Sequence, residues 1–175
     1  MGLSVKGGRG SSGQVLPSSK VSNVAKRNIR RKDCVHHRGG TGLGKGIALT
    51  LSSLGANVVI AARRTECVEE TANEITGKTG NPVLPVQMDV RDPEKIKAAF
   101  DACEAKLGVP TVIINNAAGN LYRPSERLSA NAWKTITDIV LNGTAFVTLE
   151  AGKRLIKAQK VMLNLLFMPN FMCQV

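Results

Sequence analysis

Apolar positions recur at helical spacing in one part of the chain and as a continuous β-rich run in the next. The first helical set consists of Ile47, Ala48, Leu51 and Leu54, with Gly55 following as a helix-ending residue. Residues 56–62 (ANVVIAA) then form a short apolar run of the kind that is buried on both faces of a parallel sheet. The pattern therefore predicts a helix followed by a buried strand.

The same alternation continues to residue 158. The further elements that we expect are a helix over 65–78, a strand over 82–88, a helix over 92–107, a strand over 111–114 and a long helix over 131–158. Helices and strands thus follow one another at the spacing of βαβ units. An α/β fold with a Rossmann-like, doubly wound parallel sheet is predicted.

Positive charge is concentrated in residues 1–38, which carry nine Lys and Arg against one acid, Asp33. Residues 1–32 of this leader are rich in Ser and Gly and free of acids, a composition typical of a mitochondrial transit peptide or of a disordered tail. It has no aromatic residue for base stacking, so a nucleic-acid partner is not expected. No apolar run reaches the length of a membrane span, and the cysteines lack metal-ligand spacing, so neither a span nor a metal site is predicted.

The segment before the first predicted helix does not fit the rest. Residues 31–38 (RKDCVHHR) are polar where a buried strand should stand, so we expect an incomplete sheet whose first strand is missing. Codons for this segment can be chosen so that a shifted frame encodes GKTAFITG, which would restore an apolar strand. Residues 1–38 are therefore interpreted as a basic disordered leader or as a frame-shifted segment.

Residues 39–46 (GGTGLGKG) form a glycine-rich turn with two possible interpretations. Gly40, Gly42 and Gly44 would let backbone amides approach the pyrophosphate of a dinucleotide. The alternative is a nucleotide triphosphatase loop ending at Lys45, but Gly46 replaces the Ser or Thr that should hold magnesium. About twenty residues further on, where ribose specificity is determined, Arg63 and Arg64 stand without an acid. That favours a cofactor with a 2′-phosphate.

Several motifs resemble the cofactor half of the short-chain dehydrogenase/reductase family. They are GGTGLGKG, the pair Asp89-Val90, NNAAGN at 115–120, and Asn142 in the long helix. More narrowly, INNAAGN and residues 124–160 resemble the mitochondrial group of 2,4-dienoyl-CoA reductases. The resemblance covers residues 39–160. It implies an NADPH-dependent oxidoreductase that acts on an acyl-CoA in unsaturated fatty-acid β-oxidation, as a homo-oligomer in the mitochondrial matrix.

The resemblance also implies a role for individual positions. Those expected to bind the cofactor are Gly39, Gly40, Thr41, Gly42 and Leu43 at the phosphates, Arg63 at the 2′-phosphate, Asp89 at the adenine, and Asn115 and Ala117 along the molecule. Those expected to contact the acyl-CoA are Arg91, Leu121 and Ser129, and Asn142 matches a member of the family's proton-relay group. A structural alternative stays open, since Asp89 and Ser129 could cap the segments after them and Asn115 could satisfy turn amides.

Two departures from the family pattern limit the activity that we expect. His37 and Arg38 replace a Thr and a Gly before the turn, and the pattern ends at Val161, where an aberrant tail over 161–175 begins. The family's catalytic Tyr and Lys have no counterpart, because Tyr122 is the only tyrosine and lies in a loop. We therefore expect a catalytically incomplete reductase fragment. The alternatives are a nucleotide-binding module without catalysis and a P-loop-like triphosphatase.

Overall fold

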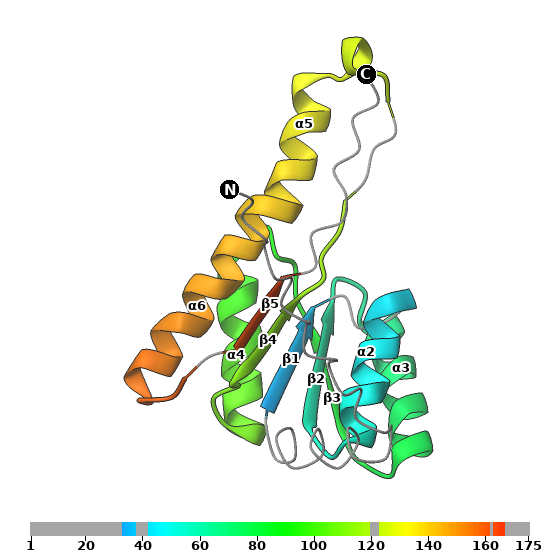
Figure 1. Ribbon diagram of the computed structural model, residues 1–175, viewed down its shortest axis with the longest axis vertical. Coiled ribbons are helices and arrows are strands. Elements are labelled where there is room, and N and C mark those ends of the chain that lie inside the picture. Colours follow the sequence, from blue (N-terminus) through cyan, green and yellow to red (C-terminus); the bar gives the residue numbers. More distant parts are fainter. Residues whose placement is uncertain (1–32, 38–41, 120–122, 162, 167–175) are drawn as a thin grey trace, which may run out of the picture.

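The computed structural model describes residues 33–37, 42–119, 123–161 and 163–166. Their centre is one five-stranded sheet in the order β3-β2-β1-β4-β5, with every neighbouring pair parallel (Figure 1). The strands are β1 (Asp33–His37), β2 (Asn57–Ala62), β3 (Val83–Gln87), β4 (Val112–Asn115) and β5 (Leu163–Leu166). The chain reverses its direction across the sheet after β3, so this is a doubly wound arrangement.

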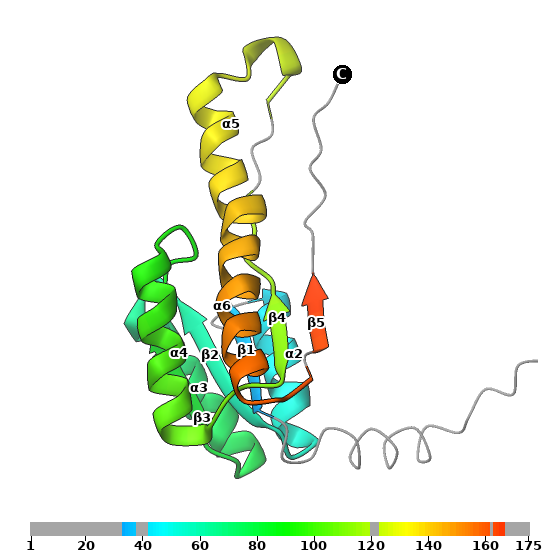
Figure 2. The same cartoon turned by 90° about the vertical axis from the view of Figure 1, so that its left-hand side faces the viewer.

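Two pairs of helices cover the two faces of the sheet (Figures 1 and 2). One pair is α2 (Gly42–Ser53) with α3 (Thr65–Thr79), and the other is α4 (Pro93–Leu107) with α6 (Gly143–Lys157). Helix α4 begins at a well-formed cap, because Asp92 accepts hydrogen bonds from the backbone of Glu94 and Lys95, and Pro93 takes the first helical position. The expected helices and strands from residue 47 to residue 115 are confirmed.

The strands divide their side chains between two cores. Val58 and Ile60 of β2 pack against α2 and α3, whereas Val59 and Ala61 pack against α4 and α6. All four are buried, which is the alternation that a strand covered on both faces requires. The largest fully buried side chain in the described residues is Phe100 of α4, which points into the core that α4 shares with the sheet. The apolar run at 56–62 therefore forms the interior of the sheet, as predicted.

The expectation that residues 31–38 provide no strand is wrong. Residues 33–37 form β1 at the centre of the sheet, in parallel register with β2 and β4. The physical reason is that strand pairing uses backbone amides and carbonyls, which any residue other than proline supplies. The position between β2 and β4 offers unpaired groups on both sides, so tertiary context overrides the side-chain pattern.

The segment after residue 160 also contributes to the sheet, which its sequence did not indicate. Strand β5 pairs with β4 from Val112↔Leu163 to Asn115↔Leu166. The sheet thereby extends beyond β4 on the side away from β3. These five strands and their helices constitute part of the Rossmann-like fold that the sequence predicts.

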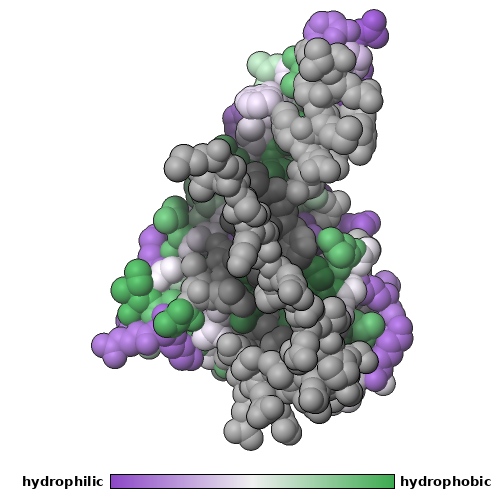
Figure 3. All heavy atoms as spheres, viewed as in Figure 1, coloured by the Kyte–Doolittle hydropathy of each residue, from purple (hydrophilic) through white to green (hydrophobic). Residues whose placement is uncertain are grey.

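The long helix expected over 131–158 is continuous but not uniform. It consists of α5 (Ala130–Thr137), a π-helical turn (Asp138–Asn142) and α6. Its first half extends beyond the sheet (Figure 1). Large apolar side chains are exposed along it, namely Trp133, Leu141, Leu149 and Ile156. Figure 3 shows hydrophobic residues, in green, on the flanks of the molecule. None of the helices in the described residues is long and apolar enough to cross a bilayer.

Candidate functional site

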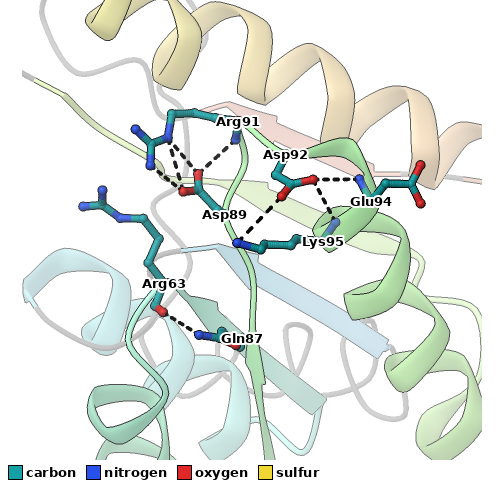
Figure 4. A network of polar contacts seen from close by, with 7 residues as sticks. All are labelled: Arg63, Gln87, Asp89, Arg91, Asp92, Glu94 and Lys95. Atoms are coloured by element: carbon teal, nitrogen blue, oxygen red, sulfur yellow. Dashed lines mark hydrogen bonds and ion pairs between the residues drawn. The ribbon is translucent and has the colours of Figure 1, made fainter.

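The carboxyl ends of β2 and β3 bring three of the predicted site residues together. Arg63 follows β2 directly, and Asp89 and Arg91 stand in the turn between β3 and α4 (Figure 4). Arg91 donates from Nε to Asp89 Oδ1 at 3.0 Å and from Nη2 to Asp89 Oδ2 at 2.5 Å. The backbone N–H of Arg91 also donates to Asp89 Oδ1 at 3.0 Å. In a doubly wound sheet this edge is where ligands bind.

The electrostatics of this group follow from the hydrogen bonds. Donation from the Arg91 side chain, and more weakly the charge of Arg63, lowers the pKa of Asp89 from 3.8 to about 2. Asp89 is therefore ionised at neutral pH, and its charge is matched by Arg91. Arg63 is exposed, its backbone carbonyl accepts from Gln87 Nε2 at 3.1 Å, and within the described residues its guanidinium has no hydrogen-bond or ion-pair partner. A cation thus remains available for an anionic group at the end of β2.

The glycine-rich turn leads into α2. Gly42 has a φ of +55°, in the left-handed region that favours glycine, and an added Cβ would meet nothing within 4 Å. The first backbone N–H groups of a helix lack intrahelical partners, so the start of α2 can donate to a phosphate. Leu43 is exposed, while Gly39, Gly40 and Thr41 lie outside the described residues.

The structure gives no support to a triphosphatase at this turn. Lys45, which would reach the terminal phosphates in such an enzyme, forms an ion pair with Glu74 of α3. Glu74 also pairs with Lys78, and the hydrogen bonds from Lys45 and then Lys78 lower its pKa to about 2. The ammonium of Lys45 therefore forms an ion pair that links α2 to α3.

Two further predicted cofactor residues lie at the end of β4. Asn115 is the last residue of the strand and is buried, and its Nδ2 donates to Thr148 Oγ1 of α6 at 3.3 Å. Ala117 is also buried and belongs to the core between the sheet and α6. Both side chains thus pack between β4 and α6 at the carboxyl end of the strand.

Asn142 is the last residue of the π-helical turn. Its Nδ2 donates to Asp138 Oδ1 at 3.0 Å, and Asp138 is also paired with Lys134. The hydrogen bonds from Lys134 and then from Asn142 lower the pKa of Asp138. Turns of π-helix are frequent at functional sites, and this one places Asn142 between two helical segments.

The residues expected to contact an acyl-CoA are not brought together in the described part of the chain. Arg91 is paired with Asp89, and Leu121 lies outside the described residues. Ser129 caps α5, with its Oγ accepting from Ala132 N at 3.2 Å, and stands at the end of the long helix that is far from the sheet (Figure 1). The capping role that stayed open for Ser129 is confirmed.

Sequence reasoning missed two contacts in this region. The Asp89–Arg91 pair joins residues that were assigned to different ligands, although their separation of two places them in one turn. Asp138 was not considered, although Lys134 and Asn142 stand four residues to either side of it, at the spacing of neighbours on a helix. Helical spacing was the signal that could have identified the second contact.

Comparison with known proteins agrees with this geometry. The family model described as short chain dehydrogenase matches residues 38–162. A Caenorhabditis elegans protein named as an uncharacterized oxidoreductase is 57% identical over 123 residues, which cover 70% of this chain and 39% of that protein. A second C. elegans protein, named as a probable 2,4-dienoyl-CoA reductase that produces (3E)-enoyl-CoA, is 54% identical over 120 residues, covering 68% and 39%.

A solved structure shows the same fold. The crystal structure of a short chain dehydrogenase from Bacillus anthracis has a TM-score of 0.72 and 37% identity, and the match covers 78% of this chain and 56% of that one. The chain spans about two fifths of the length of the curated relatives that it matches.

Proposed function

The chain belongs to the short chain dehydrogenase family, and from this premise we propose that residues 39–160 form the NADPH-binding half of a 2,4-dienoyl-CoA reductase. Family membership alone does not give the phosphorylated cofactor, the acyl-CoA substrate or the role in fatty-acid β-oxidation. The substrate is supported by the name of the C. elegans relative, which is about half identical to this chain over the shared region.

The single observation that carries the choice of cofactor is the charge at the end of β2. A cofactor without a 2′-phosphate is held there by a carboxylate, whereas a 2′-phosphate needs a cation. Arg63 occupies the position, and the nearby carboxylate of Asp89 is taken by Arg91. A guanidinium pairs strongly with a phosphate dianion. The residues present therefore fit NADPH better than NADH.

The remaining described residues fit the rest of the same cofactor. The open space beside Gly42 and the amides at the start of α2 suit a pyrophosphate. By the family resemblance, Asp89 would contact the adenine, and Asn115 and Ala117 would lie along the cofactor at the carboxyl end of β4. NADPH, when bound, supplies a hydride for reduction of the conjugated diene. The chain's own contribution is to position and orient it.

Proton transfer is the step for which these residues are poorly equipped. Asn142 can orient a group by hydrogen bonding, but an amide has no proton to give near neutral pH. The sequence contains one tyrosine, Tyr122. For a polypeptide of these 175 residues we expect dienoyl-CoA turnover at least about a hundredfold below that of a full-length relative, measured as NADPH absorbance. Turnover closer to the relative would contradict this account of the site.

The same proposal includes a mitochondrial matrix location and a homo-oligomeric enzyme. The support for the location is the basic, Ser-rich and Gly-rich composition of residues 1–32, which precede β1. A fluorescent protein fused behind these residues should enter mitochondria, and a diffuse or peroxisomal signal would refute the location. Mixing of differently tagged chains, followed by co-purification, would test the oligomer.

The direct test of the cofactor is a titration of the protein with NADPH and with NADH. Arg63→Ala should weaken NADPH binding about tenfold and change NADH binding less than twofold, because the 2′-phosphate loses its charged partner. Arg127→Ala, which removes an exposed cation outside the site, serves as the matched control. Unchanged preference in Arg63→Ala would refute the assignment, and stabilisation by Mg-ATP but not by NADPH would favour the triphosphatase.

A further inference from the structure

Asp89 stands between two arginines but is bonded to only one of them. Both of its carboxylate oxygens accept from the Arg91 guanidinium, with Nε at 3.0 Å from Oδ1 and 3.2 Å from Oδ2 and Nη2 at 2.5 Å from Oδ2. The carboxylate is 16% exposed, whereas the Arg91 side chain is 43% exposed. Arg63 points toward the pair from the end of β2 without a hydrogen bond to Asp89 (Figure 4).

This arrangement bears on how Arg63 can act. A carboxylate within reach of a guanidinium is a strong competitor for any phosphate, because it offers the same bidentate partner without a binding step. Asp89 is such a competitor for Arg63. In this structure both of its oxygens accept from Arg91 instead.

We propose that Arg91 is a positioning residue that sets the preference for a 2′-phosphate, by engaging Asp89 so that Arg63 remains available to the phosphate. This inference rests on the proposed function, and it gives Arg91 a role toward the cofactor that the resemblance did not imply. Without Arg91, the Asp89 carboxylate turns to Arg63, and the end of β2 loses its available cation.

Other charged groups near Arg91 do not remove the effect. Asp138 is close enough to act on Arg91 through its charge, but it is already paired with Lys134 and accepts from Asn142. Asp92 caps α4 and pairs with Lys95 at 3.7 Å. Among the described residues, Asp89 is thus the carboxylate with which Arg91 forms its hydrogen bonds and ion pair.

The test uses fragments that isolate the 2′-phosphate. The full chain is titrated by calorimetry with adenosine 2′,5′-bisphosphate and with 5′-AMP, and the ratio of the two affinities reports the preference. Four proteins are compared with the wild type: Arg91→Met, Asp89→Asn, the double variant, and Lys95→Met. Lys95→Met is the matched control, since it removes an exposed cation with a neighbouring carboxylate from the same segment.

We expect Arg91→Met to lower the affinity ratio about tenfold and Lys95→Met to leave it within twofold. In the double variant, Asp89→Asn should restore the ratio to near the wild-type value, because the competing carboxylate is gone. Asp89→Asn alone should change the ratio less than threefold. Folding of each variant is checked by far-UV circular dichroism, so that a loss of binding is separated from a loss of structure.

Three outcomes would overturn the inference. A ratio unchanged in Arg91→Met means that Asp89 does not compete for Arg63. A tenfold loss that Asp89→Asn fails to rescue means that Arg91 contacts the phosphate itself. In both cases the wild type still prefers the bisphosphate, so the proposed function stands. A wild type that shows no preference refutes the proposed function and the inference together.

Discussion

Two arginines of this molecule, Arg154 and Arg63, differ in how many partners the fold gives them. Arg154 on α6 is 13% exposed and forms ion pairs with Asp101 at 2.8 Å, Glu104 at 2.9 Å and Glu150 at 2.7 Å. Its guanidinium also lies over the ring of Phe100, 5.5 Å from the centroid. Arg63 at the end of β2 is exposed and has no such partners within the described residues.

The difference separates a structural cation from a ligand-binding one. Arg154 joins α6 to α4 through Asp101 and Glu104 and also donates to Glu150 of its own helix, so a ligand would have to break existing bonds. The guanidinium of Arg63 has no hydrogen-bond or ion-pair partner within the described residues, and the neighbouring Asp89 carboxylate is paired with Arg91. Arg63 is therefore the better candidate for binding an anionic ligand, because it is a charged group at the carboxyl ends of parallel strands without a side-chain partner in the part of the chain that the structure describes.

The largest expected effect is on stability, from Arg154→Met. This change removes the cation that three carboxylates share, of which Asp101 keeps its ion pair with Lys97, and we expect a loss of about 2–3 kcal/mol in the free energy of unfolding. The figure is below that for a fully buried pair because Asp101 is 52% exposed. Urea denaturation measures it. Arg127→Met, which removes a cation that is 74% exposed, should cost less than about 0.5 kcal/mol, and an equal loss in both would contradict the comparison.

A second variant, Gly143→Ala, lies where α6 contacts the turn between β3 and α4. An alanine Cβ at Gly143 would lie 2.7 Å from Cγ2 of Val90, the residue between Asp89 and Arg91. We expect Gly143→Ala to cost about 2 kcal/mol through overpacking, although alanine normally favours a helix by up to about 1 kcal/mol. It should also reduce the 2′-phosphate preference, because Val90 must shift.

Gly152→Ala is the matched control for this substitution. It lies in the same helix, and its added Cβ meets nothing within 4 Å, so it should stabilise the protein by about 0.5–1 kcal/mol. Denaturation curves of the two variants should therefore move in opposite directions. A gain in both would show that α6 can move away from Val90 at little cost.

A smaller effect is expected from acid. Because hydrogen bonds from Arg91 lower the pKa of Asp89 from 3.8 to about 2, the folded state favours the ionised carboxylate, and its contribution to stability is present above about pH 4. It is lost as the pH falls from about 4 to 2. The unfolding free energies of the wild type and Asp89→Asn should differ by about 1–2 kcal/mol at pH 6 and converge near pH 2. A difference independent of pH would indicate that the Asp89–Arg91 pair does not form in solution.

The fold was largely predictable from residue 47 onward because both faces of the sheet are buried. Runs such as residues 56–62 must then be apolar throughout, and the intervening helices show one apolar face each. Strand β1 was not predictable, because its place depends on the pairing groups of β2 and β4 rather than on its own side chains. Strand β5 was not predicted either, because its place also depends on backbone pairing, in this case with β4.

The site was predictable only in outline. Arg63 and Asp89 follow strands whose carboxyl ends meet at one edge, which the alternation of elements already implies. The side-chain pairing of Asp89 with Arg91 depends on the path of the turn after β3, and the π-helical turn at Asp138 has no distinctive sequence pattern. Such contacts are decided by local backbone geometry that spacing alone does not give.

The most direct test of the central claim is the rise in unfolding temperature caused by saturating NADPH, relative to NADH, in the wild type, Arg63→Ala and Arg154→Met. A ligand stabilises the folded state according to its affinity, so this difference reports recognition of the 2′-phosphate. We predict that Arg63→Ala unfolds at the wild-type temperature without nucleotide and loses most of the NADPH-specific rise. Arg154→Met should unfold at a lower temperature and keep that rise. The opposite pattern, or an equal loss in both variants, would contradict the assignment of Arg63 to the cofactor and of Arg154 to the fold.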